Sequence, residues 1–229
     1  MTAQDIIDNL LRVKGNIAAA AHRAGRSPEE IRLVAVSKTV DIERIKALFD
    51  AGCRDFGENR VQELVKKQPL LPEATWHFIG HLQRNKIRNV AGRVALIHSL
   101  DRWSLAEDLD RWARLNNRRL HVLVQVNVAG EETKFGVSPE EVEDFVSALG
   151  DLKGLSVDGL MTIAPYVDNP EEVRPVFREL RSISLKLSRF PFFSQKYLSM
   201  GMTNDYTVAI EEGANILRIG SAIFGSRPY

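Results

Sequence analysis

The chain has 229 residues, 44% of them hydrophobic, so it can bury a large core and is long enough for one α/β barrel or two small domains. Its 31 lysines and arginines balance 30 acidic residues, and the net charge of +1 argues against an extended nucleic-acid-binding or anionic-membrane-binding surface. A single cysteine, Cys53, excludes an internal disulfide and any multi-cysteine metal site, and we expect it to be a small core residue.

Residues 2–23 predict an amphipathic helix, because Ile6, Leu10, Val13 and Ile17 recur at steps of three and four. The amino terminus lacks the basic region and apolar core of a signal peptide. No apolar run in the sequence is long enough to cross a bilayer. We therefore expect a soluble, cytoplasmic protein.

From Ile31 onward the chain alternates eight times between a strand-like run and a segment of helical character. The predicted strands cover residues 33–37, 53–56, 75–79, 94–98, 121–127, 155–161, 196–199 and 215–219. This alternation, without a long linker, predicts one α/β domain over residues 1–229, a (β/α)8 TIM barrel with an extra N-terminal helix. The second and seventh predicted strands are short, so seven units with an irregular remainder is the alternative.

The first predicted strand is followed by a lysine. Counting back by two from Lys38 reaches Val36 and Val34, so the ammonium should point to the same side as these valines. The position is the carboxyl end of the strand, where α/β barrels carry their chemistry. A partly desolvated lysine can hold a neutral amine and form a Schiff base with an aldehyde. The alternative is a lysine that simply reaches water.

Glycines and hydroxyl side chains follow the seventh and eighth predicted strands. Ser199 with Gly201, and Gly220 with Ser221, offer two hydroxyls and several backbone amides where barrels commonly bind phosphate. Either loop alone is equally typical of a turn or a helix cap. Both loops together, opposite the lysine, predict an aldehyde ligand that carries a phosphate.

Two other polar residues are candidates for contacting such a ligand. Arg218 shares a face with Ile216 in an otherwise apolar strand, so it needs a partner, either a heteroaromatic nitrogen or a barrel carboxylate. Asn59 could bind a ring hydroxyl or cap the helix that begins near it. His77 and His81 share no helix face and have no carboxylate at zincin spacing, so we expect a hydrogen-bonded core histidine at position 77 and no metal site.

Six motifs span nearly the whole chain. They are Val34-Ala-Val-Ser-Lys-Thr39, Phe56-Gly-Glu-Asn59, Trp76-His-Phe-Ile-Gly80 with Leu82-Gln83 and Asn85-Lys86, Gly159-Leu-Met161, Leu198-Ser-Met-Gly-Met202 and Arg218-Ile-Gly-Ser-Ala-Ile-Phe-Gly225. In this order they resemble the YggS/PROSC family of pyridoxal phosphate homeostasis proteins. The resemblance implies the fold of the barrel half of alanine racemase, that is, the barrel domain of fold type III among pyridoxal-phosphate-dependent proteins.

The resemblance also implies a ligand and its contacts. Pyridoxal 5′-phosphate (PLP) would be bound covalently to Lys38 as a Schiff base, with Arg218 facing the pyridine nitrogen and Asn59 near the ring. The phosphate would be held by Ser199, the Met200 and Gly201 backbone, Gly220 and Ser221. Many relatives have threonine in place of Ser221, and the serine retains the hydroxyl.

The implied role is a monomeric carrier rather than an enzyme, one that buffers PLP or supplies it, with PLP-dependent apo-enzymes as candidate recipients. An arginine at the pyridine nitrogen disfavours ring protonation and makes the ring a weak electron sink. Alanine racemase adds a second base, a tyrosine from a further β-domain, whereas this chain ends at Tyr229 directly after its eighth unit. The alternative is a small racemase-like or lyase PLP enzyme with Tyr166 or His81 as the base.

Overall fold

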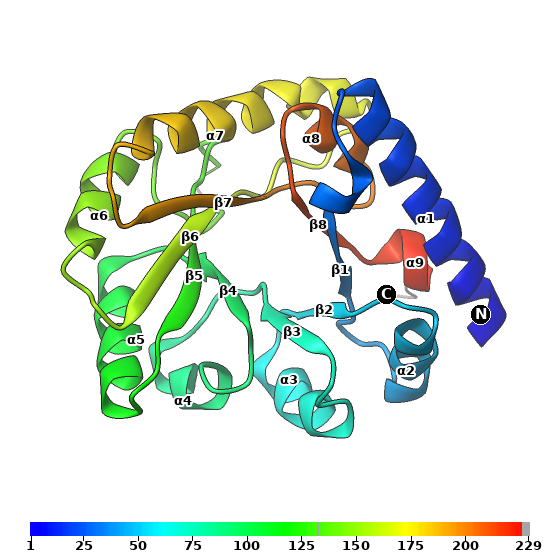
Figure 1. Ribbon diagram of the computed structural model, residues 1–229, viewed down its shortest axis with the longest axis horizontal. Helices are drawn as coiled ribbons and strands as arrows, with labels where there is room; N and C mark the ends of the chain where they lie inside the picture. Colours follow the sequence, from blue (N-terminus) through cyan, green and yellow to red (C-terminus); the bar gives the residue numbers. More distant parts are fainter. Residues whose placement is uncertain (132, 226–229) are drawn as a thin grey trace.

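The computed structural model describes residues 1–131 and 133–225, so Tyr229 lies outside the described residues. Within this part of the chain, parallel strands close into one barrel in which each strand pairs with its neighbours in sequence (Figure 1). The strands are β1 (Arg32–Val36), β2 (Asp55–Glu58), β3 (Thr75–Phe78), β4 (Leu96–Leu100), β5 (Leu120–Gln125), β6 (Leu155–Met161), β7 (Phe193–Ser199) and β8 (Ile216–Ile219). The eight-unit barrel is confirmed, and the seven-unit alternative is wrong.

Helices surround the barrel, as Figure 1 shows. They are α1 (Ala3–Arg23), α2 (Ile42–Asp50), α3 (Val61–Lys67), α4 (Ile87–Val90), α5 (Trp103–Leu115), α6 (Val142–Leu149), α7 (Arg174–Leu187), α8 (Tyr206–Glu211) and α9 (Ser221–Phe224). Short 3₁₀ turns, η1 to η4, cover Pro28–Glu30, Gln68–Leu70, Arg84–Lys86 and Pro170–Val173. The extra N-terminal helix α1 packs against α2, α8 and α9. Among the described residues, every helix is too short or too polar to span a membrane.

Strands β2 and β4 each begin two residues later than the sequence predicts. Strand β2 starts at Asp55 rather than at Cys53, because the Cys53 N–H donates to Leu48 O and closes the end of α2. Strand β2 continues through Glu58, whose side chain is fully buried. A charged residue at a buried strand position obscures the strand pattern in the sequence. Strand β4 starts at Leu96, whereas the sequence placed its start at position 94.

Apolar side chains form two separate layers. Inside the barrel, a small cluster is made by alternating residues of five strands: Val34, Leu96, Leu123, Met161 and Ile216. A much larger cluster fills the space between the sheet and the helices, and Cys53 belongs to it, as expected. Burial raises the pKa of the Cys53 thiol to about 12. The lumen is therefore a packed core below the polar end of the barrel, and not a pore.

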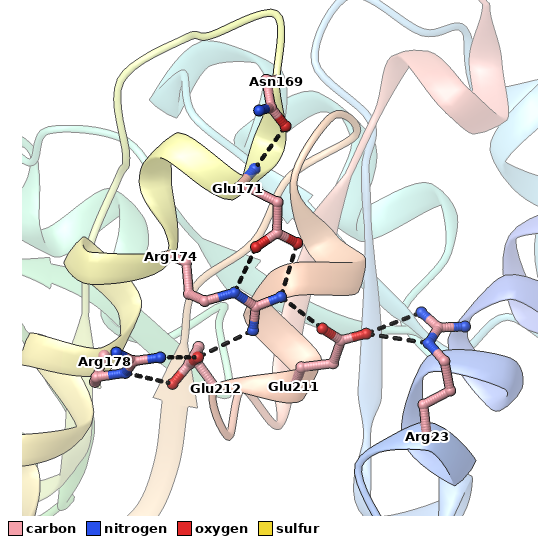
Figure 2. A network of polar contacts seen from close by, with 7 residues as sticks. All are labelled: Arg23, Asn169, Glu171, Arg174, Arg178, Glu211 and Glu212. Atoms are coloured by element: carbon pink, nitrogen blue, oxygen red, sulfur yellow. Dashed lines mark hydrogen bonds and ion pairs between the residues drawn. The ribbon is translucent and has the colours of Figure 1, made fainter.

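A network of ion pairs ties α1 to the helices that flank β7 and β8. In Figure 2, Arg174 at the start of α7 lies at its centre. The guanidinium donates to Glu171 at 2.6 and 2.8 Å, to Glu211 at 2.7 Å and to Glu212 at 3.0 Å. On its other oxygen, Glu211 accepts two hydrogen bonds from Arg23, at the end of α1, at 3.0 and 3.1 Å. Glu211 thus bridges two arginines, and the network joins α1, α7 and α8.

The carboxylates of this network are held in their charged form. The hydrogen bond from Arg174 lowers the pKa of Glu211 below its ordinary value of 4.5. Burial raises the pKa of Glu212, but hydrogen bonds from Arg178 and Arg174 outweigh it and leave the pKa lowered. Because these groups bind protons less readily in the folded state, their stabilising contribution is present above about pH 4.5 and is lost as the pH falls through the lowered values.

We expect Arg174→Met to lower the free energy of unfolding at pH 7 by about 1–3 kcal/mol, because two partly buried carboxylates, Glu211 and Glu212, each lose one of their charged donors. The difference from the parent protein should shrink as the pH falls below 4.5, where these carboxylates become protonated. Urea unfolding at pH 7 and pH 3 measures both values.

The matched control is Arg44→Met, which removes an arginine that pairs with Asp41 at 3.2 Å on the surface. That change should stay within about 0.5 kcal/mol at either pH. Equal losses for the two variants would contradict a structural role for the Arg174 network.

Candidate functional site

Polar side chains gather at the carboxyl ends of four consecutive strands of the closed ring. Strand β8 pairs with both β7 and β1, and β1 pairs with β2. The loops that carry Gly201, Gly220, Lys38 and Asn59 are therefore neighbours on one face of the barrel. The structure brings together the four loops from which the sequence predicted a site.

The loops after β7 and β8 contact each other directly. The Ser221 hydroxyl donates to Thr203 Oγ1 at 3.1 Å, and the Ala222 N–H donates to the same oxygen at 3.3 Å. Gly201 has φ +94°, and a Cβ there would lie 2.7 Å from the Ala209 Cβ, so only glycine fits this turn. Thr203 was not among the predicted site residues, and its only signal in the sequence was a hydroxyl in this loop.

The backbone of Met200 is part of the sheet. Its side chain is buried, and its N–H donates to Ile216 O at 3.2 Å. The carbonyl of Gly201 in turn accepts from the Arg218 N–H at 3.0 Å. These bonds extend the pairing of β7 with β8 beyond the strand ends and fix the course of the loop.

Arg218 is buried in the barrel among neutral oxygens. One nitrogen donates to Ser199 Oγ at 2.7 Å and the other to Thr162 O at 2.8 Å. Burial lowers the pKa of the guanidinium to about 10, and the charge of Asp205 opposes this shift. Arg218 is therefore still a cation at neutral pH. Neither of its two hydrogen bonds goes to a carboxylate, which was one of the two partners expected from the sequence.

A line of buried side chains continues from Ser199 into the lumen. Ser199 Oγ lies 2.9 Å from His98 Nδ1, and His98 Nε2 lies 2.9 Å from His77 Nδ1. His77 Nε2 lies 2.9 Å from Asp55 Oδ1. Burial, followed by the nearby His77, Arg218 and Arg32, keeps the pKa of His98 well below 6.5. His77 is a hydrogen-bonded core residue, as predicted, whereas the role of His98 was missed.

His81 has a different environment from His77. Its Nδ1 lies 2.9 Å from Asp101 Oδ2, and its ring stacks on Phe135 with centroids 3.8 Å apart. Phe135 belongs to the segment after β5, so that segment reaches the loop after β3. Among residues 1–131 and 133–225, no group of three or more His, Cys, Asp or Glu side chains could hold a metal ion.

Lys38 is half-buried and lies just after the end of β1. The residues on both sides of it are fixed by side chains of β2 and α3. Ser37 Oγ donates to Glu58 at 2.7 Å, and Ser37 O accepts from Lys67 Nζ at 2.7 Å. The Thr39 N–H donates to Glu63 at 2.6 Å, in a turn where Thr39 has φ +63°.

These anchors form one ion cluster with a buried centre, which we call the Lys67 cluster: Ser37, Thr39, Glu58, Glu63 and Lys67. Lys67 Nζ contacts Glu58 at 2.8 Å and Glu63 at 2.7 Å, so with Ser37 O all three of its hydrogens are used. Burial raises the pKa of the fully buried Glu58, and the hydrogen bond from Lys67 opposes it. Glu63 and Lys67 are four apart on α3, which was the only sequence signal for this cluster.

Asn59 carries an unsatisfied acceptor. Its Oδ1 is buried and has no hydrogen-bond partner among the described residues. The residue borders a hollow of about 180 Å³ that is also lined by His81 and Lys86. A buried carbonyl oxygen without a partner costs free energy, so this position suits a ligand that brings a hydrogen-bond donor.

Comparison with known proteins identifies the relatives of this chain. The family described as alanine racemase, N-terminal domain, matches residues 9–228. A pyridoxal phosphate homeostasis protein of Aquifex aeolicus is 47% identical over 224 residues, which cover 97% of this chain and 98% of the relative. The protein of the same name from Escherichia coli K12 is 41% identical over 240 residues, with 98% of each chain covered.

Solved structures agree with these relatives. PipY of Synechococcus elongatus, solved with PLP bound, superposes with a TM-score of 0.84 at 34% identity over 96% of this chain and 100% of PipY. An alanine racemase of Corynebacterium glutamicum gives a TM-score of 0.73 at 17% identity over 97% of this chain and 62% of the racemase. The second likeness is one of fold alone.

We expect Lys67→Met to lower the free energy of unfolding by about 3–5 kcal/mol, because it leaves the buried Glu58 carboxylate without its cation. The double variant Lys67→Met/Glu58→Gln should recover part of this loss, since it removes the uncompensated charge. Urea unfolding measures both variants.

Amide hydrogen exchange offers a local readout of the same cluster. Exchange of the Thr39 amide should accelerate in Lys67→Met, because Glu63 then loses the partner that orients it toward that amide. Unchanged exchange at Thr39 would show that the Lys67 cluster does not fix the residues around Lys38.

Proposed function

The chain belongs to the pyridoxal phosphate homeostasis protein family and has the fold of the alanine racemase N-terminal domain, and we propose that it binds PLP as a Schiff base on Lys38. In this proposal it buffers PLP or supplies it to PLP-dependent apo-enzymes. PipY, a relative of the same fold, was solved with PLP bound, which supports the choice of ligand.

The observation that carries the proposal is the arrangement of Lys38 between two fixed neighbours, beside a buried arginine. The Ser37 side chain faces Glu58 on the helix side of the sheet, so strand alternation directs the next residue, Lys38, toward the barrel axis. Arg218 pairs in register with Val34, which lines the lumen. By this alternation Lys38 and Arg218 face the same space from adjacent strands.

The other residues of the site suit the remaining parts of PLP. Bound PLP supplies an aldehyde that an amine can attack and a pyridine ring that withdraws electrons. Ser199, Gly201, Gly220 and Ser221 would hold the phosphate with hydroxyl and backbone N–H groups. Met200 would act by fixing this loop, since its own N–H is engaged in the sheet.

Two further residues would contact the ring. Asn59, whose buried Oδ1 has no partner within the described chain, would accept a hydrogen bond from the ring hydroxyl. Arg218 would donate to the pyridine nitrogen and, because it stays cationic, would disfavour a proton there.

The same features favour a carrier over an enzyme. A cation beside the pyridine nitrogen weakens the ring as an electron sink, so carbanion chemistry receives little help. Of the two candidate bases for a racemase-like reaction, Tyr166 is 80% exposed and His81 is paired with Asp101. We therefore propose a monomeric, cytoplasmic carrier without turnover of its own.

The first test is covalent. Purified protein mixed with PLP should turn yellow, and borohydride reduction followed by peptide mass mapping should place the adduct on Lys38. Lys38→Ala should lose the visible absorption band, because the amine is removed, and should keep its far-ultraviolet circular dichroism, because the change is confined to one half-buried side chain. The control is Lys153→Ala, an exposed lysine between α6 and β6 that should keep both the band and the adduct. A colourless parent protein, or an adduct on another lysine, would exclude the proposed site.

The second test separates a carrier from an enzyme. The loaded protein should restore activity to a PLP-dependent apo-enzyme added in stoichiometric amount, as followed by that enzyme's own assay. Incubated with L-alanine and no other enzyme, the loaded protein should form D-alanine no faster than free PLP does. Steady turnover of an amino acid would refute the carrier assignment and support the racemase-like alternative.

A further inference from the structure

The hydrogen-bond line from Ser199 to Asp55 runs through the barrel. It passes from β7 through His98 on β4 and His77 on β3 to β2, with each heavy-atom distance at 2.9 Å. Both histidines are fully buried. At the far end the Asp55 side chain is 18% exposed and lies 3.5 Å from Arg32, the first residue of β1, which is 40% exposed. The line therefore joins the proposed phosphate loop to solvent at the amino end of the barrel.

Counting hydrogens shows how this line must be arranged when the Ser199 hydroxyl points inward. Arg218 can only donate, so Ser199 Oγ accepts one hydrogen from it. The serine's own hydrogen then goes to His98 Nδ1, which places the His98 hydrogen on Nε2, where it is donated to His77 Nδ1. His77 in turn donates from Nε2 to the Asp55 carboxylate. Every bond is satisfied, and both imidazoles are neutral.

A ligand oxyanion that takes the Ser199 hydrogen forces the opposite arrangement. His98 must then carry its hydrogen on Nδ1 to donate to Ser199, so its Nε2 becomes an acceptor. His77 must donate to it from Nδ1. The contact between His77 Nε2 and the Asp55 carboxylate is then left without a hydrogen, which two acceptors 2.9 Å apart cannot tolerate. One additional proton is required there.

We infer that acceptance of the Ser199 hydroxyl hydrogen by a bound oxyanion is coupled to the uptake of one proton by the His77–Asp55 pair at the opposite end of the barrel. This inference rests on the proposed function, because it takes Ser199 as a contact of the ligand phosphate. The protons balance as follows. The His98 hydrogen moves from Nε2 to Nδ1, and His77 now donates from Nδ1. One proton enters from solvent beside Asp55 and supplies the hydrogen between His77 and Asp55, and no proton leaves.

The charged and titratable groups around the line locate the added proton at its far end. Asp55 on β2 favours a positive charge on His77, and Arg32 on β1 and Arg218 on β8 oppose it from the two ends. Tyr197 on β7 lies over Arg32, with 5.5 Å between the guanidinium and the ring centroid. Burial and these cations disfavour charge on His98, whose pKa is lowered. The added hydrogen therefore belongs between His77 and Asp55, at the contact of the line that the rearrangement leaves without one.

The coupling has a defined sign. Because the loaded state holds one more proton than the free state, oxyanion affinity should fall as the pH rises, by up to tenfold per pH unit over the range in which the loaded pair holds this proton and the free pair does not. A ligand that leaves the Ser199 hydroxyl donating to His98 takes up no such proton, so this coupling would give its affinity no pH dependence.

Ring ¹⁵N NMR of protein labelled at its five histidines tests the inference directly. The states to compare at pH 8 are the free protein, the protein saturated with sulfate, and the PLP-loaded protein. Sulfate is chosen because it does not itself titrate near this pH. The His98 hydrogen should lie on Nε2 in the free protein and on Nδ1 in both loaded states. A pH-stat titration should record one proton taken up per sulfate bound.

Variants assign the effect to Ser199. Ser199→Ala should abolish both the tautomer change and the proton uptake, and Ser199→Thr, which keeps a hydroxyl, should retain them. The control is His121→Asn, which removes the exposed histidine paired with Asp158 and should alter neither. The parent protein alone decides the question if Ser199→Ala does not fold.

The outcomes distinguish this inference from the proposed function. A yellow, PLP-loaded protein whose His98 keeps its hydrogen on Nε2 overturns the coupling and leaves the carrier role intact. A protein that never takes up PLP overturns the carrier role, and the sulfate titration still decides the coupling. An unchanged His98 with both ligands overturns the coupling outright.

Discussion

The closed barrel imposes one constraint, that a polar side chain sent into its lumen costs free energy unless it finds a hydrogen-bond partner there. Arg218 is the most demanding case, because a buried guanidinium without partners would cost several kcal/mol. It is satisfied by one hydroxyl and one backbone carbonyl, at 2.7 and 2.8 Å. Because both partners are neutral, no carboxylate of the described residues lies within hydrogen-bond distance of the charge on Arg218. The histidines beyond Ser199 meet the same requirement, since each ring nitrogen in the line has a hydrogen-bond partner. A single strand residue, Arg218, thus supplies the buried positive charge of the site.

The outer side of the sheet solves the same problem differently. Lys67 is buried between the sheet and α3, and it is matched by two carboxylates and a carbonyl. One of these partners, the Ser37 carbonyl, precedes Lys38 in the chain, and the two carboxylates accept hydrogen bonds from Ser37 and Thr39 on either side of it, so an ion cluster on the helix side fixes the backbone around Lys38. Rigid support from outside and a cationic environment inside are therefore separate contributions. In the proposed site they would act on Lys38 from opposite faces of β1.

The sequence was informative wherever periodicity carries the signal. Alternation by two put Val34 on the side of Lys38 and Ile216 on the face of Arg218, and the structure packs Val34 and Ile216 in one cluster inside the barrel. Strand β6 was bounded correctly at Leu155–Met161. Partners distant in the chain could not be read this way. His98 and Ser199 are 101 positions apart, and only closure of the barrel brings them to 2.9 Å. Glu58 misled the boundary of β2 because a charged residue at a buried strand position makes sense only beside Lys67.

The extra N-terminal helix α1 supports the helices after β7 and β8, a role that counting the strand and helix units of the barrel does not reveal. Helix α9, which begins with Ser221, is a single turn and cannot hold its place by its own hydrogen bonds. Helix α1 packs against both α8 and α9, Asn9 donates to Ile223 O at 3.1 Å, and Asn16 donates to the Tyr206 hydroxyl at 3.0 Å. Arg23 then closes the far end through Glu211 (Figure 2). The loops after β7 and β8 are consequently braced from behind by the first helix of the chain, so the geometry at Gly201 and Ser221 depends on residues that never approach a ligand.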